Sequence, residues 1–268
     1  MSRSRGGVSL RPVQGDGGVL RRFRLPYPTA LFDDLRNRVS LGERATAVDL
    51  ACGTGQIAFP LATHVSEILA VDQEEESIAF GRAKADALGV TNIRWVVSAA
   101  EDVALEGAFD LVAIGNAFHR LERGVVVERL LPHLPDGACV ALLWGGTPWR
   151  GERPWQRTLF ETLERWRDTA GVRDRVPQGW ADAIDRDPHE NVFRRAGLTY
   201  EGEFRFAVDA QWTVESLAGF VYSTSFLNRQ ALGDKLSDFE RDLRRVIGDE
   251  VVEAEMGFAY QLARKARR

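Results

Sequence analysis

Cysteine is scarce in this chain, which has only Cys52 and Cys139 among its 268 residues. Both fall in apolar segments that we expect to form buried strands or strand ends. This excludes a disulfide framework and predicts a reducing, cytoplasmic location. The four histidines form no cluster with Cys, Asp or Glu at metal-ligand spacing, so we expect no metal site.

Long apolar runs and an excess of positive charge are also missing. No apolar segment approaches the about 20 residues that span a bilayer, and the first residues lack the apolar core of a signal peptide. The net charge of -4 argues against a general nucleic-acid binder. Arginines do gather near the start, where we expect residues 1–22 to form a solvated, flexible arm. These absences weigh against a nucleic-acid or membrane partner.

The most informative segment that is present runs from Val48 to Gly55, where an apolar strand carries Asp49 and then breaks into a glycine-rich turn. Gly53 and Gly55 let the backbone approach a ligand where a Cβ atom would collide. A second apolar run ends on Asp72, at the distance where an acidic residue binds a ribose in a βαβ unit. Together these features predict a cofactor that contains adenosine.

Two cofactors fit this pattern. The glycine spacing from Gly53 to Ala58 matches a dinucleotide fingerprint, which leaves an NAD-dependent oxidoreductase as an alternative. Asp49 weighs against a dinucleotide, because its carboxylate would repel a pyrophosphate held in the adjacent turn. S-adenosylmethionine (SAM) has no phosphate and carries an ammonium and a sulfonium, which a carboxylate attracts. Asp49 therefore favours SAM.

Four segments resemble, in order, the motifs of class I SAM-dependent methyltransferases of the small-molecule type: 49–55, Asp72 with Gln73, 98–102 and 109–119. The resemblance is good over 23–144 and holds only in outline beyond. It implies cofactor contacts from Asp49, Ala51, Cys52, Gly53, Thr54, Gly55, Asp72, Gln73, Ala99, Ala100, Glu101, Asn116 and Ala117.

Two positions depart from the family pattern. Ala51 stands where a first glycine is common, which adds one methyl group to the loop. Ala99 stands where many relatives have a carboxylate for the adenine amino group, so that Glu101 or the main chain would have to supply this contact.

The segment Phe23 to Pro28 resembles the stretch that folds over the bound cofactor as a lid in this family. The resemblance implies that Arg24 and Tyr27 contact the cofactor. The alternative is a rigid extended entry to the first helix, because two prolines preset an extended backbone.

Hydrophobic periodicity predicts an α/β fold with a doubly wound parallel sheet whose ligands bind at the carboxyl edge. It places strands at 45–50, 67–71, 93–97, 109–114 and 138–144, and helices at 29–39, 56–65, 74–88, 100–105, 120–134 and 154–169. The family resemblance implies a last crossover helix at 189–197 and two further strands at 200–208 and 251–263, which complete a seven-stranded, mostly parallel sheet.

The predicted domains are a SAM-binding core with the lid segment at 23–144, a substrate-cap insertion at 145–188, and the rest of the sheet at 189–268 with a helical insertion at 213–247. Six of the seven tryptophans lie from Trp144 onward. Several of them, Trp149 and Trp180 among them, either line an apolar substrate cover or pack helices in the core.

Methyl transfer needs orientation and exclusion of water more than acid–base chemistry. His119 is the candidate general base, because it follows the fourth strand on the ligand edge. Alternatively it only forms a hydrogen bond. Phe118, His119, Trp149 and Trp180 are the candidate substrate contacts.

The sequence thus predicts transfer to an N or O atom of a small molecule. The acidic loop at 180–187 favours a cationic amine, such as an amino sugar in secondary metabolism or antibiotic biosynthesis, although it also reads as a solvated loop. A SAM-binding interaction protein without catalysis remains an alternative, and a homodimer is left open.

Overall fold

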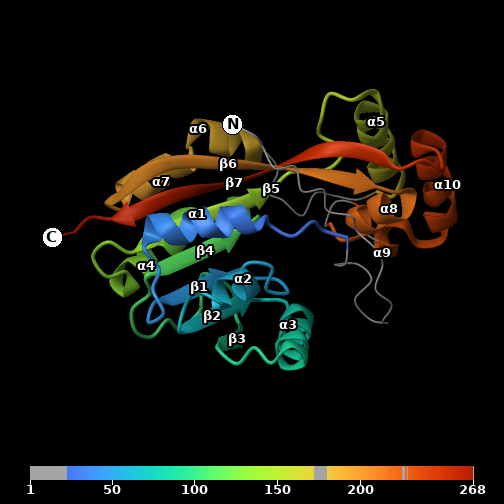
Figure 1. The fold of residues 1–268 in the computed structure, drawn as a ribbon. Helices are drawn as coiled ribbons and strands as arrows, with labels where there is room; N and C mark the ends of the chain where they lie inside the picture. The colour runs from blue at the N-terminus through green and yellow to red at the C-terminus, as the bar shows by residue number, and fades with distance from the viewer. Residues whose placement is uncertain (1–22, 172–179, 225–226, 228, 268) are drawn as a thin grey trace, which may run out of the picture. The chain divides into compact units, whose positions relative to one another are not determined.

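The computed structural model describes residues 23–171, 180–224, 227 and 229–267 (Figure 1). The chain divides into two compact units. The sheet unit contains the described residues of 27–145, 179–206 and 258–268. The helical unit contains those of 1–26, 146–178 and 207–257. The predicted arm at 1–22 lies outside the described residues.

Seven strands form one sheet in the order β3-β2-β1-β4-β5-β7-β6 (Figure 1). The first five are parallel neighbours, and β7 runs antiparallel to β5. This confirms the predicted doubly wound, mostly parallel sheet. The strands are β1 Thr46–Leu50, β2 Glu67–Asp72, β3 Ile93–Val97, β4 Leu111–Gly115, β5 Cys139–Gly145, β6 Leu198–Trp212 and β7 Val252–Lys265.

The strands at the centre of the sheet are buried on both faces. No residue from Leu111 to Ile114 is more than 1% exposed. On one face, Val48, Leu50 and Val112 join a large apolar cluster with α4 and α7. Such near-continuous apolar runs are typical of parallel strands covered by helices on both sides. Because β1, β2 and β4 are parallel, their carboxyl ends lie at one edge of the sheet, and polar residues follow the strands there.

The helices of the sheet unit are α1 Thr29–Val39, α2 Ala58–Ala62, α3 Glu75–Leu88, η2 Phe118–Arg120, α4 Arg123–Leu130, η3 Leu131–His133, α6 Trp180–Arg186 and α7 His189–Arg195. Those of the helical unit are α5 Pro154–Thr169, α8 Val214–Tyr222, α9 Arg229–Leu232, η4 Gly233–Lys235 and α10 Leu236–Ile247. Predicted helices at 29–39 and 154–169 are confirmed at both ends.

Three predicted helices near the ligand edge were wrong in length or existence. The helix expected at 56–65 is shortened to α2, because the turn after β1 continues through Ile57. The segment 100–105 forms one turn and then extends, and its Val103 carbonyl accepts a hydrogen bond from Arg129 on α4. The helix expected at 120–134 is divided into η2, α4 and η3.

The acidic loop expected at 180–187 was also wrong, because most of it is helix α6. Asp182 lies in its first turn, where a carboxylate complements the helix dipole. Asp187, just past its end, is paired with two arginines. The charges of Asp182 and Asp187 therefore serve local structure.

In the helical unit, aromatic side chains join α5 and α8 to α10. Trp166 packs edge-on against Phe239 at 5.6 Å between ring centroids, and its indole Nε1 donates to Asp242 at 3.2 Å. The Tyr222 hydroxyl donates to Glu240 at 2.9 Å. Trp166 is therefore a packing residue, as one of the two readings of the tryptophans proposed.

Candidate functional site

The loop after β1 has the backbone of a ligand cradle. Ala51, Gly53 and Gly55 have φ angles of 57°, 55° and 84°, all in the left-handed region. The Cys52 amide donates to the Val71 carbonyl at 2.9 Å, which ties the loop to β2. The departure at Ala51 thus does more than add a methyl group, because a left-handed non-glycine residue costs about 1–2 kcal/mol.

Asp49 on β1 lies beneath this loop and is only 1% exposed. Its Oδ2 accepts a hydrogen bond from the Ala58 amide at 2.8 Å, whereas Oδ1 is buried with no hydrogen-bond partner among the described residues. Burial, with a smaller effect of the Asp72 carboxylate, raises the pKa of Asp49 to about 8. An unsatisfied buried acceptor at this edge fits a cationic ligand group.

Asp72 at the end of β2 fixes the same loop from the neighbouring strand. Its Oδ2 accepts from the Gly53 amide at 2.7 Å, and its Oδ1 accepts from the Glu74 amide at 2.9 Å. Gln73 between them is exposed. The Asp72 carboxylate therefore links the first two predicted motifs by a hydrogen bond.

Trp95 on β3 holds the glycine loop in a way that the sequence analysis missed. A Cβ atom on Gly55 would lie 2.6 Å from Trp95 Cη2, and one on Gly81 of α3 would lie 2.4 Å from its Cζ3. The Trp95 ring, 8% exposed, thus fits closely against both glycines. A glycine inside a helical pattern, such as Gly81, is the signal that could have indicated this close approach.

The third predicted motif contributes fewer side chains to the ligand edge than expected. Ala100 is 9% exposed and belongs to the apolar core cluster. Glu101 accepts a hydrogen bond from the Glu122 amide at 3.1 Å, at the start of α4. Ala99 is partly exposed, and its carbonyl accepts a hydrogen bond from Ser98 Oγ. Contacts of these residues with adenine remain predictions.

The fourth motif, 109–119, includes β4 and continues past its end with Asn116 and Ala117. Asn116 has a φ of 49°, and its Nδ2 donates to the Tyr27 hydroxyl at 3.2 Å. A Cβ on Gly115 would lie 2.5 Å from Ile57 Cδ1. Tyr27, 8% exposed, is thereby fixed at the end of β4 next to the loop after β1.

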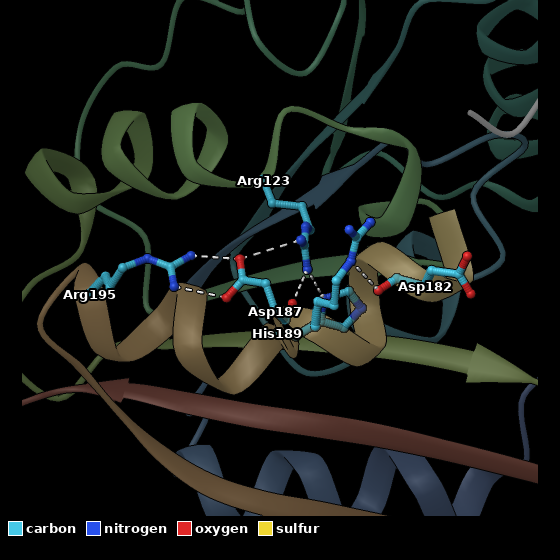
Figure 2. A network of polar contacts seen from close by, with 6 residues as sticks. Arg123, Asp182, Asp187, His189 and Arg195 are labelled. Carbon is cyan, nitrogen blue, oxygen red and sulfur yellow. Dashed lines mark hydrogen bonds and ion pairs between the residues drawn. The ribbon is translucent and has the colours of Figure 1, made fainter. Parts of the chain in front are cut away.

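A polar network supports the following turn, η2. Figure 2 shows Arg123 of α4 reaching toward the turn between α6 and α7, where it donates to the Asp187 carbonyl at 2.8 Å and contacts His189 Nδ1 at 3.2 Å. Arg195 holds the Asp187 carboxylate with two bonds of 2.8 Å. The Phe118 ring packs edge-on against His189 at 5.0 Å. Burial, with Arg123 nearby, lowers the pKa of His189 to about 4.

His119 lies in this turn, half-buried. Burial and the adjacent Arg120 guanidinium lower the pKa of His119 to about 4. The Arg120 Nε–H points to His119 Nε2 at 3.4 Å. The imidazole is therefore neutral at pH 7, and it is a weaker base than an ordinary histidine.

Two predicted site residues, Arg24 and Trp149, belong to the helical unit, and the side chain of a third, Trp180, is not described. Arg24 belongs to the helical unit, where its guanidinium donates to Ser223 Oγ and O at 3.2 and 3.0 Å. Trp149, in the same unit, packs edge-on against Phe220 at 5.4 Å. Trp180 is the first residue of α6, and its side chain lies outside the described residues. Their contacts with cofactor or substrate remain predictions.

The described residues also contain no grouping of His, Cys, Asp and Glu that could hold a metal ion. None of the helices that the structure describes is long and apolar enough to cross a membrane. The cofactor edge is thus built from two carboxylates, left-handed loop backbone and apolar packing.

Part of the chain is similar to a known protein family. Residues 47–136, from β1 to the turn before β5, match the family described as a methyltransferase domain. No curated protein sequence matches the chain.

Solved structures share the fold. A protein provisionally named a type II methyltransferase, from Anaeromyxobacter dehalogenans, is 22% identical with a TM-score of 0.57, over 91% of this chain and 99% of its own. The YcgJ protein of Bacillus subtilis is 16% identical with a TM-score of 0.55, over 90% and 100%. A geranyl diphosphate methyltransferase in complex with SAM is 15% identical with a TM-score of 0.50, over 94% and 92%. Residues 47–136 of this chain thus match a methyltransferase domain, and the chain shares the fold of these solved structures.

Proposed function

We propose that this protein transfers the methyl group of SAM to a nitrogen or oxygen atom of a small molecule. The observation that carries the proposal is Asp49, whose buried Oδ1 lacks a partner among the described residues and lies beneath a left-handed loop. A carboxylate there suits the cationic part of SAM and opposes a pyrophosphate. Asp49, the backbone of 51–55 and Asp72 would hold the cofactor, which supplies an activated methyl group. The protein then has to orient the acceptor and exclude water.

The state of His119 favours nitrogen as the acceptor atom. A hydroxyl is a poor nucleophile until its proton is removed, and an imidazole whose pKa is about 4 removes it poorly. A neutral amine attacks without a base. Asp187 is paired with Arg123 and Arg195, so the negative charge of segment 180–187 no longer favours an amino sugar in particular. Amino sugars and other secondary metabolites remain acceptors to be tested.

The direct experiment is a mass-shift screen of amines, amino sugars and phenols incubated with SAM and the full chain. Methylated product together with S-adenosylhomocysteine would establish the activity. SAM binding with no product from any acceptor class would favour a SAM-binding interaction protein. Binding of NADH without SAM binding would instead support the oxidoreductase alternative.

We expect Asp72→Ala to weaken SAM binding by about 1.5–3 kcal/mol, the range for a hydrogen bond to a charged group. The substitution also releases the Gly53 amide from its partner in the loop. Titration calorimetry measures the loss, and Glu76→Ala on the exposed first turn of α3 is the matched control. Equal affinity in wild type and Asp72→Ala would remove this carboxylate from the cofactor site.

For an amine acceptor, we expect His119→Ala to lower kcat/KM by less than about tenfold between pH 6 and 9, because no base is required. The pH profile of wild type should show no inflection near 6.5, since the pKa of His119 lies at about 4. His64→Ala, in the turn between α2 and β2, is the control. A loss of about 10²- to 10⁴-fold that no pH restores would show that His119 acts as a base on a hydroxyl.

A further inference from the structure

A surface depression of about 260 Å³ lies in the helical unit, at the start of α5. It is lined by Trp149, Arg150, Gly151, Arg157, Phe160 and Glu161. All six residues belong to the helical unit, so the depression is complete within it. Its volume is just below the about 300–1,000 Å³ of drug-sized sites, which suits a molecule with a single ring.

The wall of the depression is fixed by a buried amide. Gln156, 4% exposed, donates from Nε2 to the Pro148 carbonyl at 2.8 Å, and its Oε1 accepts from the Arg153 amide at 3.2 Å. A Cβ on Gly151 would lie 2.2 Å from this Oε1. Trp149 is 6% exposed and rests on Phe220. The loop is thereby held in place, as a preformed site requires.

The depression combines an aromatic wall with positive charge. Phe160 is 39% exposed, an unusual position for a large apolar ring. The guanidinium groups of Arg150 and Arg157 form no hydrogen bond or ion pair with the residues that the structure describes. Phe160 and Glu161 follow Arg157 by three and four residues, so both lie next to Arg157 on the surface of α5. With two arginines and one glutamate, the lining of the depression carries a net charge of +1.

We propose that this depression binds a small organic anion with a flat apolar body, an aromatic carboxylate in chemical class. A guanidinium presents paired donors that match a carboxylate, and aromatic side chains supply contact area for a ring. Glu161 disfavours a compact dianion such as phosphate, because like charges would be brought together. The site is assigned from residues of the helical unit alone and does not depend on the proposed methyl transfer.

The test uses the full chain and three probes: benzoate, its neutral analogue benzamide, and inorganic phosphate. We expect saturable benzoate binding in saturation-transfer NMR, with benzamide and phosphate each about tenfold weaker, because only benzoate combines ring and single charge. Arg150→Gln and Arg157→Gln should each weaken benzoate binding by about tenfold. Arg165→Gln removes a guanidinium from the same helix outside the depression, and it should bind benzoate normally.

SAM affinity, measured on the same variants, should stay unchanged, which separates this site from the cofactor site. Benzamide binding as well as benzoate, or full benzoate binding by the Arg150→Gln/Arg157→Gln double variant, would overturn the proposal. So would an equal loss in Arg165→Gln. If SAM binds but benzoate does not, the depression has no such ligand while the cofactor assignment stands.

Discussion

Binding of SAM at pH 7 is expected to release close to one proton, and Asp49 is the group that loses it. Without cofactor, the pKa of this carboxyl is about 8, because it is buried and lies near Asp72, so most molecules carry the proton. A cationic ligand stabilises the carboxylate and lowers that pKa. By linkage, the SAM association constant should rise about tenfold per pH unit from pH 5 to 7. Above about pH 8 the ligand's own α-amino group loses its charge and the rise should stop.

The proton is counted by titration calorimetry at pH 7 in phosphate and in Tris, two buffers with different ionisation enthalpies. The matched control is Asp49→Asn, which keeps the side-chain shape but cannot ionise. It should bind SAM more weakly, release no proton and show a flat pH dependence. Identical binding heats of the wild type in both buffers would be incompatible with a protonated Asp49.

The same shift predicts how stability changes with pH in the cofactor-free protein. The folded-state pKa of Asp49 is raised from 3.8 to about 8. Its contribution to the free energy of unfolding is therefore fully present below about pH 4 and is lost as the pH rises through 8. Urea unfolding should show a decline over this range in wild type that is smaller in Asp49→Asn.

Substitution Gly55→Ala should destabilise the protein and remove SAM binding together. The new methyl group would overlap Trp95, costing about 1–3 kcal/mol for overpacking. The left-handed backbone at φ 84° adds about 1–2 kcal/mol. Trp95 has no room to retreat, because Gly81 lies against the same ring. Urea unfolding measures the first effect, and calorimetry with SAM measures the second.

Gly53→Ala is the control that separates backbone strain from overlap. Its φ is 55°, yet a Cβ there would meet no atom within 4 Å. It should therefore cost only the strain of about 1–2 kcal/mol. The double variant Gly55→Ala/Trp95→Leu should lose less stability than the sum of its single changes, since the overlap with Trp95 is gone and only the looser contact with Phe59, at 3.1 Å, remains. Equal destabilisation by the two alanines would mean that Trp95 does not restrain the loop.

Much of the sheet unit could be predicted because its strands are short and apolar along their whole length. Strand β3 and helix α1 begin and end where the periodicity placed them. Asp49 and Asp72 could be identified as site residues because parallel strands bring their carboxyl ends to one edge. The local sequence pattern was sufficient to predict these features.

Features that depend on distant neighbours could not be predicted. Segment 100–105 has apolar residues at helical spacing, yet Arg129 of α4 and the amide of Glu122 engage its polar groups. The low pKa of His119 comes chiefly from burial, which a sequence motif does not record. The segment 180–187 was expected to be an acidic loop, whereas most of it is helix α6 and Asp187 is neutralised by arginines from α4 and α7.

The position of β7 between β5 and β6 has a consequence for how the chain folds. Strand β6 is made before β7, which is its one neighbour among the strands that the structure describes. Until β7 emerges from the ribosome, both β5 and β6 keep an unpaired backbone edge, which can pair with other chains. β7 must then insert between two strands already made, forming contacts far apart in sequence, which are slow to form. Nascent chains stalled before β7 should therefore need chaperones to stay unaggregated.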